Sequence, residues 1–233
     1  MFKEKLENIT DFELKSLRNI DSRGFRYELI TAIDHIKSYI ETYNPDYIIL
    51  TGSSPQIVIA ILDFLNIPVR FRVLNWGIEI NGIVYKTPGI EEKERERELD
   101  LMIKNSYPDL NPNSRLLFLD DFSDTGSKAQ FYKDRLSSIG YTHVKFGTIA
   151  TSRDNVAVDQ GCVDTVGSNE ATFSHPIRVL SLFILFAKND VEGSQTFRHY
   201  ADLYLSRFNN VLKSLKREPF FDKVKKNLLK DNL

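Results

Sequence analysis

Short apolar runs alternate along this chain with longer stretches in which apolar residues recur at helical spacing. The runs at 47–50, 116–119 and 143–150 combine leucine, isoleucine, valine, threonine or aromatic residues and predict buried strands. The stretches 56–65 and 128–139 follow the first two runs and predict helices. Strands that alternate with helices in this way predict an α/β fold with a mostly parallel sheet.

Further elements complete this order. A strand is expected at 68–74, and the alternation over 76–85 around an Asn-Gly turn predicts a β-hairpin. A charged helix follows at about 90–105, and a short strand pair is expected between 156 and 166. The resulting order is typical of a doubly wound sheet, in which ligands bind at the carboxyl ends of the strands.

Both ends of the chain are predicted to be mostly helical. Near the N-terminus, Thr10 and Glu13 fit a capping box, and one helical face collects Leu29, Ile33, Ile36 and Ile40. We therefore expect three parts: a helical segment at 1–43, an α/β core at 44–168 and a mostly helical segment at 169–233.

Composition narrows the class of protein. The 233 residues carry a formal net charge of −1, so no overall field favours nucleic acid, and the single cysteine, Cys162, excludes an intrachain disulfide. The charged N-terminus lacks the apolar core of a signal peptide, and no apolar run approaches the length of about 20 residues that crosses a bilayer. These features predict a cytoplasmic protein with neither a membrane nor a nucleic-acid partner.

The segment 116–128 carries the strongest chemical signal. Its sequence is Leu-Leu-Phe-Leu-Asp-Asp-Phe-Ser-Asp-Thr-Gly-Ser-Lys, which reads as a buried strand delivering acids to its carboxyl end, followed by a turn that opens a helix. The first N–H groups of a helix lack intrahelical partners and face the positive end of the dipole, so they bind phosphate. Carboxylates accept hydrogen bonds from vicinal hydroxyls, so a ligand with both a phosphate and a ribose diol fits this segment.

This segment resembles the ribose-phosphate motif of type I phosphoribosyltransferases, in which four apolar residues precede an acidic pair, two variable residues and Asp-Thr-Gly. The resemblance covers roughly 45–167. It implies that Asp120 and Asp121 hold the ribose hydroxyls and that Asp124 lies under the anomeric carbon. It also implies that the 5′-phosphate is cradled by Thr125, Gly126, Ser127 and Lys128. The family usually has threonine where this chain has Lys128, which can reach a phosphate as a point charge.

A second loop stands where the family places its pyrophosphate loop, after the first core strand and before a helix. It consists of Thr51, Gly52, Ser53 and Ser54, with Pro55 at the first helical position. Glycine lets the backbone approach a phosphate, and the serines supply hydroxyl donors beside a helix N-terminus. The loop lacks the basic residue or extra glycines that family members often carry. Taken alone, it also fits a plain strand-to-helix turn with a serine cap.

The predicted hairpin corresponds to the ribbon that closes over the reacting centre in these enzymes. Here that segment runs from Trp76 to about Gly89, and Lys86 is the cation best placed to meet pyrophosphate. An ordinary exposed hairpin explains the same pattern.

The resemblance implies binding of phosphoribosyl pyrophosphate or a nucleoside 5′-monophosphate. It also implies transfer of the phosphoribosyl group to a base-like acceptor with release of pyrophosphate, by a homodimer. Mg²⁺ would be held chiefly by oxygens of the ligand and by water. In that reaction Asp124 would be the general acid/base or charge-stabilising group, with Asp120 and Asp121 positioning the ribose. Two alternatives stay open: a catalytically silent phosphoribosyl or nucleotide sensor, including a component of a defence system, and a helical assembly protein with a vestigial site.

Overall fold

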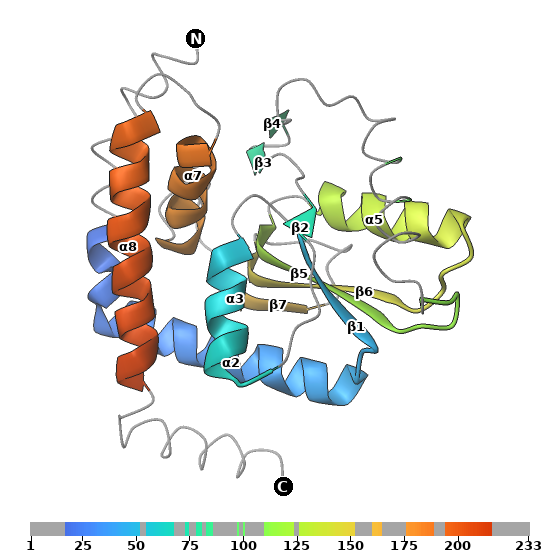
Figure 1. Cartoon of the computed structure of the whole chain (residues 1–233). Coiled ribbons are helices and arrows are strands. Elements are labelled where there is room, and N and C mark those ends of the chain that lie inside the picture. The colour runs from blue at the N-terminus through green and yellow to red at the C-terminus, as the bar shows by residue number, and fades with distance from the viewer. Residues whose placement is uncertain are drawn as a thin grey trace, which may run out of the picture.

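A computed structural model describes residues 17–51, 55–67, 73–74, 78–80, 83–85, 97, 100, 110–123, 126–151, 160–164, 176–188 and 194–215. At its centre is a five-stranded, all-parallel sheet in the order β2-β1-β5-β6-β7 (Figure 1). The strands are β1 (Tyr47–Thr51), β2 (Val73–Leu74), β5 (Leu116–Ser123), β6 (Val144–Thr151) and β7 (Gln160–Asp164). The predicted α/β class with a parallel sheet is therefore confirmed, whereas the double winding stays a prediction.

The helices alternate with these strands as the apolar spacing indicated. They are η1 (Arg18–Asp21, a 3-10 turn), α2 (Arg23–Tyr43), α3 (Pro55–Phe64), α5 (Ser127–Ser138), α7 (Pro176–Lys188) and α8 (Ser194–Leu215). Pro55 opens α3 as predicted, because proline suits the first helical position. A two-stranded antiparallel hairpin of β3 (Ile78–Ile80) and β4 (Ile83–Tyr85) confirms the hairpin expected around the Asn-Gly turn.

The central strand β5 is longer than its apolar run. It pairs with β1 from Leu116 to Leu119, and with β6 all the way to Ser123. The predicted end at Leu119 is therefore wrong, because β6 continues to Thr151 and offers ladder partners to the polar half of β5. Of the strand pair expected between 156 and 166, one strand, β7, is described and lies parallel to β6, and the rest of that range lies outside the described residues.

Side chains of β5 alternate between two separate apolar clusters, as the two-residue period of a strand requires. Leu117 and Leu119 belong to a large cluster with side chains of α2, α3, α7 and α8. Leu116 and Phe118 belong to a smaller cluster with side chains of α5. Helices α2 and α5 accordingly lie on opposite sides of the sheet in Figure 1.

The terminal helices share the larger cluster with the α/β core. The ring centroids of Phe25 in α2 and Phe208 in α8 lie 6.5 Å apart, and both side chains are buried. In Figure 1 α8 stands beside α7 at one edge of the molecule. The described parts of the three predicted segments are thus joined by packing, while the boundaries at 43 and 168 stay predictions.

The charged helix expected at about 90–105 is described at two positions, Arg97 and Asp100, both helical. Asp100 receives two hydrogen bonds from the Arg135 guanidinium of α5, with donor–acceptor distances of 3.1 and 2.5 Å. Within the described ranges, no helix is long and apolar enough to cross a membrane.

Candidate functional site

The candidate site lies at the carboxyl ends of β1 and β5. When the β3–β4 hairpin is set aside, the sheet order in terms of successive core strands is 2-1-3-4-5. In sheets of this order, ligands bind outside the carboxyl ends at the switch point between the first and third core strands. Here those two strands are β1 and β5. The sheet topology therefore predicts a ligand site beside Thr51, at the end of β1, and the acids of β5.

Buried polar side chains collect at this end of the sheet. In the part of the chain that the structure describes, all buried polar or charged residues except Ser114 lie here: Thr51, Asp120, Asp121, Ser123, Lys128, Thr148 and Ser181. Burying such groups is costly unless each finds a hydrogen-bond or ionic partner. A polar cluster inside an otherwise apolar core is therefore a candidate functional feature.

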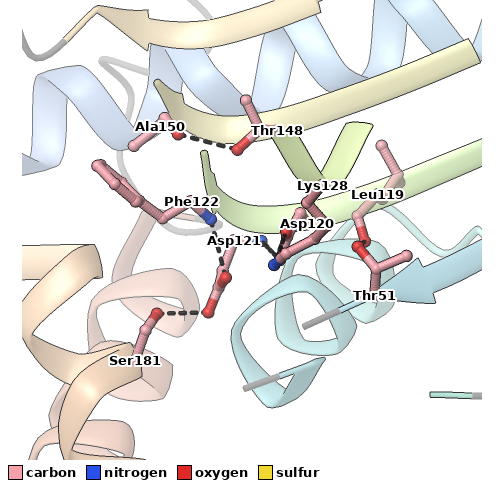
Figure 2. Close-up of polar contacts among 9 residues, drawn as sticks. All are labelled: Thr51, Leu119, Asp120, Asp121, Phe122, Lys128, Thr148, Ala150 and Ser181. Atoms are coloured by element: carbon pink, nitrogen blue, oxygen red, sulfur yellow. Dashed lines mark hydrogen bonds and ion pairs between the residues drawn. The ribbon is translucent and has the colours of Figure 1, made fainter. Parts of the chain in front are cut away.

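Asp120 points to the side of the sheet that α5 covers. One carboxylate oxygen accepts a hydrogen bond from the Asp121 backbone N–H at 2.9 Å. The other lies 2.5 Å from the Lys128 ammonium (Figure 2). The Asp120 side chain is fully buried. Asp120 is thus held on one oxygen by the backbone and on the other by a buried cation.

Burial raises the pKa of Asp120 from 3.8 to about 8, because the charged form loses its hydration. The Lys128 cation opposes this rise in the pKa, and the neighbouring Asp121 carboxyl adds to it. The ion-pair geometry alone suggests a low pKa, but the complete removal of the carboxyl from water outweighs one cation. Asp120 therefore binds its proton more tightly than an exposed aspartic acid does.

Lys128 occupies an unusual place for a cation. It is the second residue of α5, where the helix dipole favours negative charge. Its side chain is nevertheless 11% exposed and aimed at Asp120. Lys128 is thus an internal cationic partner of Asp120.

Gly126 makes the turn that brings α5 against β5. Its φ of 81° is in the left-handed region, which glycine adopts without the steric cost of a Cβ. It immediately precedes α5, and its carbonyl accepts the Gln130 N–H at 2.9 Å. Having no side chain, Gly126 cannot itself cap the first N–H groups of α5, where the sequence predicts a phosphate cradle.

Asp121 points to the opposite side of the sheet, toward α7. One carboxylate oxygen accepts the Phe122 backbone N–H at 2.8 Å. The other accepts a hydrogen bond from the Ser181 hydroxyl of α7 (Figure 2). Asp121, like Asp120, accepts a hydrogen bond from the backbone N–H of the next residue. Its side-chain donor Ser181, however, is neutral and comes from α7 rather than α5.

The opposite directions of the two acids follow from the length of β5. A strand that ended at Leu119 would release both carboxylates into a loop, as the sequence suggested. Because β5 instead stays paired with β6 through Ser123, its successive side chains must alternate between the two faces.

The other predicted site residues divide into two groups. Thr51 ends β1 and is fully buried, with its hydroxyl 3.5 Å from the Leu119 carbonyl, and Ser127 is the exposed first residue of α5. The remaining predicted positions lie outside the described residues: Gly52, Ser53, Ser54, Lys86, Asp124 and Thr125.

Ser181 is the residue that sequence reasoning missed. It lies in an apolar stretch of α7, Val179-Leu180-Ser181-Leu182-Phe183, within a segment that has no counterpart in the resemblance. One signal was present, because a lone hydroxyl inside so apolar a helix requires a polar partner. The sequence did not indicate which partner that would be.

Among the residues that the structure describes, no group of three or more His, Cys, Asp or Glu side chains is arranged to hold a metal ion. The two aspartates, on opposite faces, do not form a chelating pair by themselves. The expectation that Mg²⁺ binds here, held by oxygens of a ligand and by water, stays a prediction.

No protein-family model and no curated protein matches this chain. Among solved structures, a purine phosphoribosyltransferase from Pyrococcus horikoshii is 17% identical, with a TM-score of 0.39 over 59% of this chain and 83% of that one. Hypoxanthine-guanine phosphoribosyltransferase from Schistosoma mansoni, in complex with IMP, is 15% identical, with a TM-score of 0.30 over 58% of this chain and 62% of that one.

A different class of enzyme is also similar to this chain. Tagatose-6-phosphate ketose/aldose isomerase from Escherichia coli is 18% identical, with a TM-score of 0.38 over 88% of this chain and 54% of that one. None of these similarities carries a functional assignment, which must rest on the residues of the chain itself.

Proposed function

We propose that this chain binds a phosphoribosyl ligand, either phosphoribosyl pyrophosphate or a nucleoside 5′-monophosphate, at the carboxyl ends of β1 and β5. The observation that supports this proposal is the buried Asp120–Asp121 pair beside the N-terminus of α5. The two carboxylates offer acceptors for ribose hydroxyls, and the start of α5 offers N–H donors for a phosphate.

In this proposal each residue type has a distinct task. Asp120 and Asp121 accept hydrogen bonds from the ribose. Because their side chains enter opposite faces of the sheet, this contact requires the polar end of β5 to rearrange when the ligand binds. The 5′-phosphate is held by the cradle, Thr125, Gly126, Ser127 and Lys128. The loop formed by Thr51, Gly52, Ser53 and Ser54 approaches the pyrophosphate, and Lys86 is the cation that the hairpin would bring over it.

The reaction that follows is transfer of the phosphoribosyl group to a base-like acceptor, with pyrophosphate leaving. Positive charge develops at the anomeric carbon as the bond to pyrophosphate breaks, and Asp124 would stabilise that charge from below. When bound with the ligand, Mg²⁺ neutralises charge on the departing pyrophosphate. Binding in the correct geometry supplies the remaining assistance.

A catalytically silent sensor of the same ligand is the second candidate function. The Lys128–Asp120 ion pair favours it, because one of the two acids already has a full charge partner within the protein. A ligand must then compete with Lys128 for Asp120, or draw Lys128 onto its phosphate. Either event ties ligand binding to a movement at the start of α5.

Isothermal titration with phosphoribosyl pyrophosphate and Mg²⁺ tests the proposal. We expect the wild-type protein to bind and the double variant Asp120→Asn/Asp121→Asn to lose binding while keeping its far-UV circular dichroism. Asp134→Asn is the control, because it also changes an aspartate to asparagine, but Asp134 is exposed on α5 whereas Asp120 and Asp121 are buried on β5. Equal affinity of the wild-type protein and the double variant would contradict the proposal.

Pyrophosphate release separates the two candidate functions. Release in the presence of one base from a panel would identify a transferase and its acceptor. Binding without release from any base would favour the sensor. The predicted homodimer and cytoplasmic location stay predictions, and sedimentation with and without the ligand tests the first.

A further inference from the structure

Helix α7 contributes a side chain to the acid pair although it lies outside 45–167, the part that resembles phosphoribosyltransferases. Ser181 is 5% exposed, and its hydroxyl hydrogen-bonds to the Asp121 carboxylate (Figure 2). The residues around it on α7 are apolar and belong to the larger core cluster, among them Val179, Leu180 and Phe183. Packing therefore fixes the backbone that carries the hydroxyl.

The hydroxyl of Ser181 has two acceptors within reach and one hydrogen to donate. Its oxygen lies 2.9 Å from the Ile177 carbonyl, one helical turn earlier, as well as within hydrogen-bond distance of Asp121. In an α-helix the Ile177 carbonyl also accepts the backbone N–H four residues later, so it does not depend on the hydroxyl. A carboxylate is the stronger acceptor of the two. The Ser181 hydroxyl therefore donates its hydrogen to Asp121.

The geometry points to Ser181 as a positioning residue for Asp121, and this inference rests on the proposed phosphoribosyl function. The Phe122 N–H holds one carboxylate oxygen and the Ser181 hydroxyl holds the other, so the plane of the carboxylate is set before a ligand arrives. A hydroxyl orients a carboxylate without adding a charge. Asp121 can thus present an oriented acceptor to a ribose hydroxyl, and the Ser181 donor at this bond is neutral.

The test compares Ser181→Ala with the wild-type protein for two probes in Mg²⁺: phosphoribosyl pyrophosphate, which carries the ribose, and inorganic pyrophosphate, which does not. We expect Ser181→Ala to weaken binding of phosphoribosyl pyrophosphate about tenfold, the equivalent of one charge-assisted hydrogen bond. Binding of pyrophosphate should stay unchanged. Ser114→Ala is the matched control, since Ser114 is also buried but lies at the opposite end of β5.

Ser181→Cys is the second variant, because a thiol is similar in shape and a weaker donor. It should reduce binding of phosphoribosyl pyrophosphate by less than Ser181→Ala, and it keeps the test valid if the alanine variant fails to fold.

Ser181 would have only a structural role if Ser181→Ala weakened binding of both probes equally. If only Ser181→Cys folds, the same comparison is made with that variant. No loss for either probe would overturn the inference while leaving the proposed function intact. Failure of the wild-type protein to bind phosphoribosyl pyrophosphate would instead remove the proposed function itself, and this inference with it.

Discussion

Asp120 and Asp121 are neighbours in sequence, yet the protein surrounds them in different ways. Each has one oxygen bound to the next backbone N–H. The second oxygen of Asp120 meets a cation from α5, whereas the second oxygen of Asp121 meets a hydroxyl from α7. The alternation of side chains along β5 creates this difference, because it sends the two carboxylates to opposite faces of one sheet.

The different partners of Asp120 and Asp121 indicate that the two carboxylates have different roles. The Asp120–Lys128 pair is electrostatic and buried, so it responds to pH and to any anion that competes for the lysine. The Asp121–Ser181 pair is a neutral-donor hydrogen bond anchored in the core, so it controls direction more than charge.

Lys128→Met is the variant expected to have the largest effect on stability. It leaves a buried carboxyl without its cation, which costs about 3 kcal/mol in the free energy of unfolding when Asp120 is ionised. Because the wild-type pKa of Asp120 is about 8, this loss should grow as the pH rises above that value. Urea unfolding at pH 6 and pH 9 measures it.

The double variant Lys128→Met/Asp120→Asn controls for the loss of packing. Removing both charges should recover much of the stability lost at pH 9, because no uncompensated charge stays buried. If the single and double variants were equally unstable at pH 9, the ion pair would not be the feature that distinguishes Asp120 from Asp121.

The free energy of unfolding should depend on pH through Asp120. The pKa of Asp120 is raised by burial from 3.8 to about 8, so the folded state retains a proton that the unfolded state releases. Relative to Asp120→Asn, the stability contributed by this proton is complete below pH 3.8 and is lost progressively as the pH rises through about 8. Urea unfolding of both proteins across this range tests the sign. A gap that widened in favour of the wild-type protein with rising pH would contradict the raised pKa.

Ser181→Ala should cost less than Lys128→Met because it removes a neutral donor. We expect a loss of about 1–3 kcal/mol, the range for leaving a buried acceptor without its partner. Urea unfolding measures this loss, with Ser114→Ala as the reference for removal of a buried hydroxyl elsewhere. A loss as large as that of Lys128→Met at pH 9 would erase the proposed difference between the two acids.

Gly126→Ala is expected to have the smallest effect of these variants. A residue with a Cβ at a φ of 81° is strained by roughly 1–2 kcal/mol. The resulting shift at the start of α5 should disturb Lys128 and Asp120 but leave Asp121 and Ser181 in place. The NMR chemical shifts of the two aspartate carboxyl carbons test this expectation. Equal changes at Asp120 and Asp121 would show that the surroundings of the two acids are coupled.

Several elements could be predicted from local pattern alone. The 47–50 run, the β3–β4 hairpin and helix α5 appear within a residue or two of their predicted bounds, because apolar spacing and turn residues act locally. The end of β5 could not be predicted in this way. Asp120 and Asp121 look like loop residues by composition, and only the ladder with β6 keeps them in a strand.

The sequence by itself determined that two adjacent acids follow a buried apolar run and precede a glycine turn and a helix. This much is encoded by neighbouring residues, whose backbone preferences and periodicity need no distant partner. Only the tertiary structure decided that Asp120 meets Lys128 while Asp121 meets Ser181. The second partner lies 60 residues away on a helix brought there by packing of the apolar core, and its choice depends on which face of the sheet each side chain enters.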